Sequence, residues 1–202
     1  MTEPKPAEAR RKEIVEAARQ LFITKGYEET STVDIMNAVG IAKGTLYYHF
    51  SSKEEILDAL IEYITDQMET AALPFGEDQR IPIPDRIVGV IRAINIEGAG
   101  ERGIIDALHL PNNALFHQKS HALTIDKIGP IMMMIVEDGI RQGIFHTDYP
   151  MSAVHMALSY GLTAFDSDQS QSPEMIRGFI YHLERMLGTG EGELRKLMEL
   201  FN

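Results

Sequence analysis

The chain has 202 residues, 44% of them hydrophobic and 24% charged, which is ordinary for a globular protein. It contains no cysteine, which excludes disulfides, thiol catalysis and cysteine-bound zinc. Its formal net charge of −11 argues, on its face, against a nucleic-acid partner. No apolar run approaches the roughly 20 residues that cross a bilayer, and the polar first residues lack the apolar core of a signal peptide. We therefore expect a cytoplasmic protein without a membrane segment.

Charge is distributed unevenly along the chain. No Asp or Glu occurs between Asp34 and Glu54, whereas this acid-free stretch contains Lys43, His49 and Lys53. Because salt screening confines electrostatic fields to about 10 Å, such a stretch can bind phosphates even in an acidic protein. A stretch of this length without acids also arises by chance, so the local structure has to decide.

Local signals divide the N-terminal part into short helices. Residues 1–8 contain two prolines and no apolar anchor, so we expect a disordered arm. Apolar residues at three- and four-residue spacing predict a helix from Ala9 to Lys25, which Gly26 ends. The motif Ser31-Thr-Val-Asp34 predicts a capping box at the start of a second helix, which Gly40 ends after two turns.

A third short helix is expected over about residues 43–49 and a fourth over 52–73, opened by a second capping box in Ser52-Lys-Glu-Glu55. Helices of seven or eight residues are marginal without tertiary support. We therefore predict that the first helix packs on the next two in a three-helix helix-turn-helix unit. A linker is marked by Pro74, Gly76, Pro82 and Pro84, so the domain boundary is placed between residues 73 and 74.

Beyond this linker we expect a larger helical domain over residues 74–202. No segment of the chain shows the sustained alternation typical of a strand, so the predicted fold class is all-α. The expected helices, separated by glycine or proline, lie at 84–97, 102–109, 112–142, 150–166, 173–187 and 191–201.

In a helix-turn-helix unit the second helix of the pair enters the major groove with its N-terminal residues foremost. The small Ala42 and Gly44 permit a close approach, while Lys43 and Thr45 can contact phosphates or bases. The alternative is a helical bundle that does not bind DNA, in which the adjacent tyrosines are half-buried. The residues expected at a DNA interface are Ser31, Thr32, Ala42, Lys43, Gly44, Thr45, Tyr47, Tyr48 and His49.

These segments resemble a known family. Ala17-Ala-Arg-Gln-Leu-Phe22, Thr30-Ser-Thr-Val-Asp-Ile35 and Gly40-Ile-Ala-Lys-Gly-Thr-Leu-Tyr-Tyr-His-Phe50 resemble the DNA-binding domain of the TetR family of repressors, over roughly residues 10–70. The resemblance implies a homodimeric transcription regulator, usually a repressor, that binds a palindromic operator in double-stranded DNA. It also implies a phosphate contact by Lys53, and a C-terminal pocket for a small-molecule effector of unknown identity.

Helical phase in the C-terminal domain predicts a mostly apolar pocket, suited to a small apolar effector. Methionine adapts to varied apolar ligands, but it is also common core filler, so a solid core is the alternative. His117 and His121 have metal-ligand spacing and follow His109, but no carboxylate lies between the two, so we expect no metal. The expected ligand-binding residues are Phe116, His117, His121, Met132, Met134, Met156 and Tyr160.

The helices expected at 150–166 and 173–187 have broad apolar faces, which predict an intersubunit four-helix bundle in a homodimer. An enzyme is a competing class, and an interaction module that does not bind DNA is another. The chain has no glycine-rich phosphate loop, nucleophile elbow or recognisable pair of catalytic carboxylates, so we expect no catalytic residue and no cofactor. The residues expected at the dimer face are Val154, Leu158, Leu162, Phe165, Ile176, Phe179, Ile180, Leu183 and Leu187.

Overall fold

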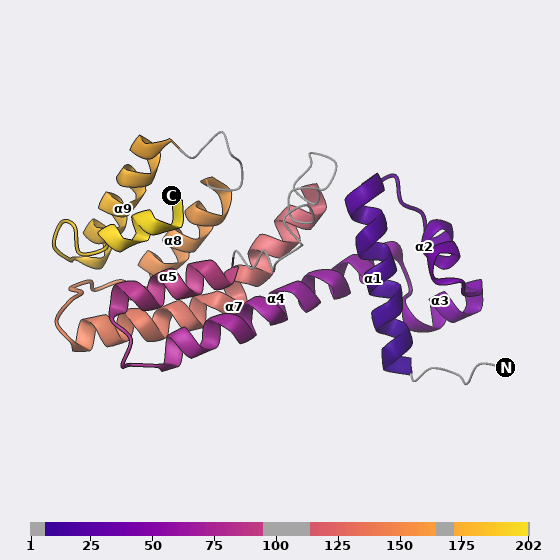
Figure 1. Cartoon of the computed structure of the whole chain (residues 1–202), viewed down its shortest axis with the longest axis horizontal. Helices are drawn as coiled ribbons and strands as arrows, with labels where there is room; N and C mark the ends of the chain where they lie inside the picture. The colour runs from indigo at the N-terminus through magenta and orange to yellow at the C-terminus, as the bar shows by residue number, and fades with distance from the viewer. Residues whose placement is uncertain (1–6, 95–113, 165–171, 202) are drawn as a thin grey trace. The chain divides into compact units, whose positions relative to one another are not determined.

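The computed structural model describes residues 7–94, 114–164 and 172–201. These residues form helices, turns and loops with no strand among them (Figure 1), which confirms the predicted all-α fold. They divide into two compact units. The first unit contains described residues 7–64 and 114–120, and the second contains 65–94, 121–164 and 172–201. No helix within the described ranges is long and apolar enough to cross a membrane.

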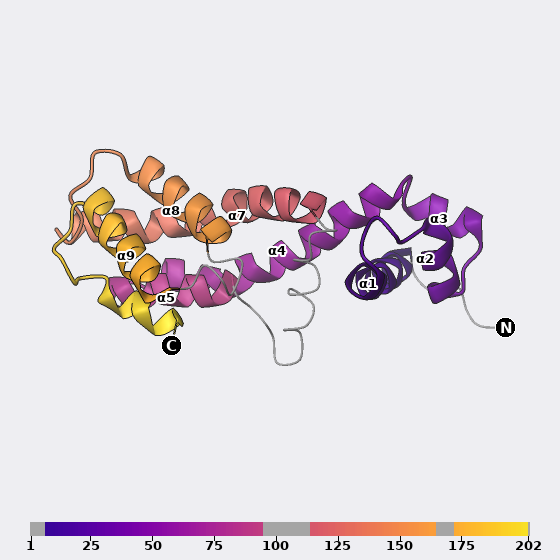
Figure 2. The same ribbon diagram turned by 90° about the horizontal axis from the view of Figure 1, so that it is seen from above.

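The first unit is built on three N-terminal helices and the start of a fourth. The first helix begins at Ala7, two residues before the expected start, and residues 1–6 of the predicted arm lie outside the described residues. Figure 2 looks almost along this helix and shows the second beside it. The helices are α1 (Ala7–Lys25), α2 (Thr32–Val39), α3 (Lys43–His49) and α4 (Lys53–Glu77), the last of which continues into the second unit.

The turn between α2 and α3 forms as the sequence predicts. Gly40 ends α2 in the left-handed conformation with φ of 72°, which disfavours residues with a side chain. Its amide donates to the carbonyl of Met36 at 2.9 Å, and the next amide, of Ile41, bonds to the same carbonyl. The buried core of the first unit includes Ile14, Ala18, Phe22, Ile35, Leu46, Phe50, Ile56, Leu57 and Leu60.

The second unit contains the remaining helices, except for residues 114–120 at the start of α7, which belong to the first unit. Their bounds agree with expectation within a few residues, although the expected helix at 102–109 lies outside the described residues. The last element is a 3-10 helix rather than the expected α-helix, because i→i+3 bonds such as Leu197 N–H to Leu194 C=O tighten it. The elements are α5 (Ile83–Ile94), α7 (Ala114–Arg141), α8 (Pro150–Ala164), α9 (Pro173–Leu187) and η3 (Arg195–Phe201).

The predicted end of the fourth helix at Leu73 is wrong, because α4 runs through Pro74 to Glu77. The reason is a buried arginine from α5. The Arg86 guanidinium donates to the carbonyl of Phe75 at 2.7 Å and to that of Gly76, so the last carbonyls of the helix are satisfied. Arg86 also pairs with the buried Asp138 at 2.6 Å, which fixes it in place.

Much of the predicted dimer face is also wrong, because the apolar stripes of α8 and α9 pack into the core of their own unit. Leu162 and Phe179 are partly buried there, and Phe165 lies outside the described residues. Five large apolar side chains on these two helices remain exposed: Met151, Met156, Tyr160, Met175 and Tyr181. The expected interface residues that are buried instead are Val154, Leu158, Ile176, Ile180, Leu183 and Leu187.

Candidate nucleic-acid interface

Helix α3 is fixed to its unit by one buried side chain and directs most of the others outward. Leu46 is 1% exposed, whereas Tyr47 is 45% and Tyr48 78% exposed. Tyr48 therefore does not fit the alternative in which the tyrosines are half-buried. His49 is partly buried and its ring meets that of Tyr48 edge-on at 5.0 Å. The helix offers hydroxyl and imidazole groups on an exposed surface, which suits hydrogen bonding to phosphates.

The first turn of α3 is open and carries a cation. A Cβ atom added at Gly44 would have no neighbour within 4 Å. Lys43 Nζ lies 5.7 Å from the centre of the Tyr47 ring, and no carboxylate pairs with it among the described residues. Ala42 is exposed and Thr45 partly buried. The four residues expected to enter the major groove first, 42–45, thus form an edge that has mostly small side chains and one positive charge.

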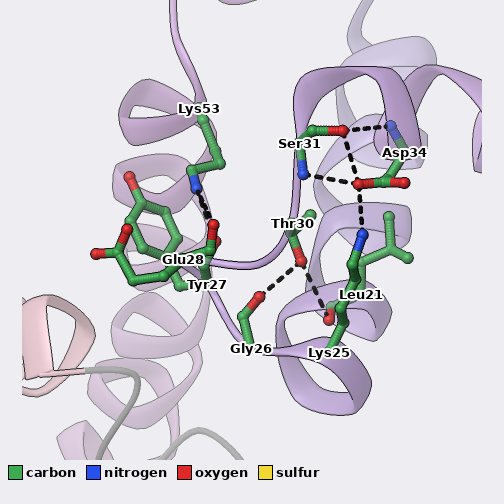
Figure 3. Close-up of polar contacts among 9 residues, drawn as sticks. All are labelled: Leu21, Lys25, Gly26, Tyr27, Glu28, Thr30, Ser31, Asp34 and Lys53. Atoms are coloured by element: carbon green, nitrogen blue, oxygen red, sulfur yellow. Dashed lines mark hydrogen bonds and ion pairs between the residues drawn. The ribbon is translucent and has the colours of Figure 1, made fainter.

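Ser31 and Asp34 form the predicted capping box at the start of α2 (Figure 3). The Asp34 amide donates to Ser31 Oγ at 3.1 Å, and Ser31 donates to Asp34 Oδ2 from its amide at 2.8 Å and its hydroxyl at 2.7 Å. The hydroxyl proton is therefore engaged, which conflicts with the expected donation from Ser31 to a phosphate. Thr32, which is partly buried, retains its place as the expected contact at this helix end.

Lys25 completes the cap and was missed by sequence reasoning. Its Nζ donates to Asp34 Oδ2 at 2.8 Å (Figure 3). This hydrogen bond makes the largest contribution and those from Ser31 the next largest, and together they hold the pKa of the Asp34 carboxyl well below its usual range. The carboxylate at the border of the acid-free stretch is thus ionised and paired with a cation.

Lys53 does not offer the free cation that the expected phosphate contact requires. Its Nζ donates to the carbonyls of Tyr27 at 2.7 Å and Glu28 at 3.3 Å, and it lies 4.2 Å from the centre of the Tyr27 ring (Figure 3). The same loop is held by Thr30, which donates to the carbonyl of Gly26 at 2.7 Å. Lys53 therefore fastens the α1–α2 loop to the start of α4.

The capping box predicted for Ser52-Lys-Glu-Glu55 forms only in part. The Glu55 amide donates to Ser52 Oγ at 3.1 Å, as expected. The Glu55 carboxylate accepts instead from the amide and hydroxyl of Ser51, at 2.6 and 2.7 Å. These two bonds lower the pKa of Glu55.

The expected ligand-binding residues are distributed over different surroundings. Phe116 is buried in the first unit, and Met132 is buried in the packed core of the second. Met156 and Tyr160 are 57% and 45% exposed, and Tyr160 stacks on Phe179, so their assignment to an enclosed pocket conflicts with the structure. The remaining three are the partly buried His117 and His121 and the exposed Met134.

The described part of the second unit has a hollow of about 630 Å³ beside α4, α5 and η3, and none of the seven expected residues lines it. Its lining includes apolar side chains such as Phe75 and Val88, together with Arg92 and the ion pair of Lys196 with Asp85. No group of three or more metal-ligating side chains occurs within the described ranges, which do not include His109.

Comparisons with known proteins agree with this geometry. The family model for "Bacterial regulatory proteins, tetR family" matches residues 14–60, and that for "Tetracyclin repressor-like, C-terminal domain" matches 98–171. The repressor KstR2 of Rhodococcus jostii is 29% identical over 143 residues, 69% of either chain. The regulator UidR of Escherichia coli K12 is 35% identical over 105 residues, 52% of this chain and 50% of that protein.

Among solved structures, that of RolR in complex with resorcinol has a TM-score of 0.67 and 19% identity, and covers 95% of this chain and 93% of that one. This likeness supports the fold, while the two family models match one segment in the N-terminal part of the chain and one in the C-terminal part. The chain belongs to the tetR family of bacterial regulatory proteins, which are helix-turn-helix transcriptional regulators and not enzymes.

Proposed function

We propose that this regulator is a cytoplasmic repressor that binds a palindromic operator as a homodimer and is released by a small, largely apolar effector. The observation that carries the DNA-binding part is the exposure of α3, whose side chains face outward around a single buried anchor, Leu46. A helix of seven residues held in this way has its exposed face available for a groove. The acid-free stretch includes all of α3, so the helix itself contributes no carboxylate to that face.

Within this proposal Lys43, Gly44 and Thr45 approach the bases, with Ala42 at the helix start. Tyr47, Tyr48, His49 and Thr32 contact phosphates, whereas Ser31 and Lys53 mainly stabilise the unit through the hydrogen bonds described above. The reading unit extends from residue 9 into α4, and the remaining chain supplies the dimer and effector functions.

The dimer is proposed to form through the exposed side of α8 and α9. Met156, Tyr160, Met175 and Tyr181 give this side large apolar and aromatic groups, which are enriched in the buried cores of protein interfaces. Two copies related by a twofold axis would form a four-helix bundle. Dimerisation matters for function because two reading helices, about 34–36 Å apart, contact successive major grooves.

The effector is proposed to be a small molecule with an apolar body and one or two polar groups. RolR, which shares the fold, has been solved with resorcinol, a compound of this general kind. Phe116, His117, His121 and Met134 keep their place as candidate contacts. Thermal-shift screening of small aromatic compounds, resorcinol among them, tests this part if each compound that raises Tm is then assayed for release of DNA.

Fluorescence anisotropy with a labelled random-sequence duplex tests DNA binding itself. We expect binding at 50 mM salt that weakens steeply as salt rises, because phosphate contacts release counterions. An enzyme or an interaction module that does not bind DNA would leave the anisotropy unchanged at every salt concentration. That result would contradict the proposed function.

A further inference from the structure

The two carboxylates that border the acid-free stretch are both paired with lysines. Asp34, at its start, accepts from Lys25 of α1 at 2.8 Å. Glu54, at its end, accepts from Lys119 of α7 at 2.7 Å. The second pair joins residues 65 positions apart in the chain, so sequence spacing gives no sign of it. Because both of these acids are paired with lysines, neither end of the acid-free stretch carries an unpaired negative charge.

Lys119 neutralises two acids on successive turns of α4. Its Nζ lies 2.7 Å from Glu54 Oε1 and 2.6 Å from Asp58 Oδ1. The lysine side chain is 28% exposed and the two acids are 56% and 53% exposed, so the cluster lies at the surface of the first unit. Hydrogen bonds to Asp58 and Glu54 raise the pKa of Lys119, which keeps its charge.

The third acid in these turns, Glu55, is already bound by the amide and hydroxyl of Ser51. All three carboxylates that follow the acid-free stretch therefore have donors. Without Lys119, Glu54 and Asp58 would present two bare negative charges starting five residues after His49, the end of α3. At physiological salt the screening length is about 8 Å, so bare carboxylates within about that distance of a bound phosphate repel it.

We propose that Lys119 is a positioning residue for DNA binding, which masks Glu54 and Asp58 from the operator phosphates. The proposal rests on the proposed function. Lys119 stands on α7, which continues from the first unit into the second after residue 120. The mask is therefore supplied by a helix of the C-terminal part of the chain. Displacement of the start of α7 unmasks both acids and lowers DNA affinity.

The test compares Lys119→Met with a matched control, Lys127→Met. Lys127 lies on the same helix, binds Asp66 and is 3.9 Å from Glu69, but it belongs to the second unit. Both variants lose one α7 lysine that bridges two α4 acids. Dissociation constants are measured by anisotropy at 50 and 200 mM salt, on a duplex selected with the parent protein. We expect Lys119→Met to lose about two- to fivefold in affinity per subunit, more at low salt. Lys127→Met should bind as the parent does.

A rescue variant separates masking from simple support of the fold. If the charges of Glu54 and Asp58 cause the loss, the triple variant Lys119→Met/Glu54→Gln/Asp58→Asn recovers parental affinity, although the ion pairs are still absent. Three results would contradict the proposal about Lys119 while leaving the proposed function intact. They are a Lys119→Met variant with parental DNA affinity, an equal loss of affinity in Lys127→Met, and a loss that the triple variant does not recover. A parent protein that binds no duplex would overturn the proposed function and the mask with it.

Discussion

Gly44 offers a substitution that separates DNA contact from stability. It lies in the first turn of α3, is exposed, and has a backbone conformation that any residue can adopt, since only five other glycines have positive φ among the described residues. A Cβ atom there would meet nothing within 4 Å. Gly44→Leu therefore disturbs no packing in the free protein.

The expected effects on stability and on binding have opposite signs. Replacing an exposed helical glycine by a good helix former stabilises by about 0.5–1 kcal/mol, which raises Tm by roughly 1–4 °C in a chain of this size. In a complex, by contrast, the leucine side chain holds the helix away from the bases. A lost base contact costs about 1–3 kcal/mol, and the dimer loses one in each half-site. We expect operator affinity to fall roughly 30-fold to 10⁴-fold.

The assay pairs thermal unfolding with anisotropy on a selected operator duplex. Gln67→Leu serves as the control, because it adds the same side chain at an exposed position of α4 in the second unit. The control should keep parental affinity. If Gly44→Leu binds the operator as tightly as the parent, α3 does not approach the bases through its first turn, and the assigned reading face is wrong.

Other substitutions test other parts of the molecule. Lys43→Ala should reduce the slope of log binding constant against log salt concentration by about one unit per subunit. Tyr47→Phe should instead weaken binding to every duplex by about 1 kcal/mol. Titrations at several salt concentrations distinguish the two effects, and an unchanged slope in Lys43→Ala would exclude a phosphate contact by Lys43. Tyr181→Glu places a charge on the exposed side of α9 and should give a monomer by light scattering at micromolar concentration, while a parent that is already monomeric contradicts the dimer. Arg86→Met removes one of the two arginine partners of Asp138, which keeps Arg141, and takes the donor from the carbonyls of Phe75 and Gly76. It should cost about 1–3 kcal/mol of unfolding free energy in urea, and an unchanged unfolding free energy would mean that Arg86 does not anchor the end of α4. The pKa of Asp34 is lowered in the folded state, so the stability it confers is fully present above about pH 4 and is lost as pH falls through the folded-state pKa. The stability difference between the parent and Asp34→Asn, measured by urea unfolding, should therefore shrink on acidification, and a constant difference would disprove the role of the charge.

Local interactions explain which features the sequence could predict. The capping box of Ser31 and Asp34, the left-handed Gly40 and the bounds of α3 all depend on bonds within a few residues. The family motif covers the same segment and includes the exposed Tyr47 and Tyr48. Rules of this kind need no knowledge of the rest of the fold.

The features that sequence reasoning missed depend on partners far away in the chain. Helix α4 continues past Pro74 because Arg86 donates hydrogen bonds to the carbonyls of Phe75 and Gly76 at its end. Arg86 follows these two residues by eleven and ten positions. Lys53 faces the α1–α2 loop because two carbonyls 25 and 26 residues earlier accept from it. An apolar stripe such as that of α9 shows that a face is buried, but it does not distinguish the core of the same chain from a partner subunit.

Selection of duplexes from a random-sequence pool with the full-length protein tests the central claim most directly. The account predicts enrichment of an inverted repeat whose half-site centres lie about 34–36 Å apart, or a multiple of this distance, bound by two subunits. Enrichment of no sequence, or of a single half-site bound by one subunit, would contradict it.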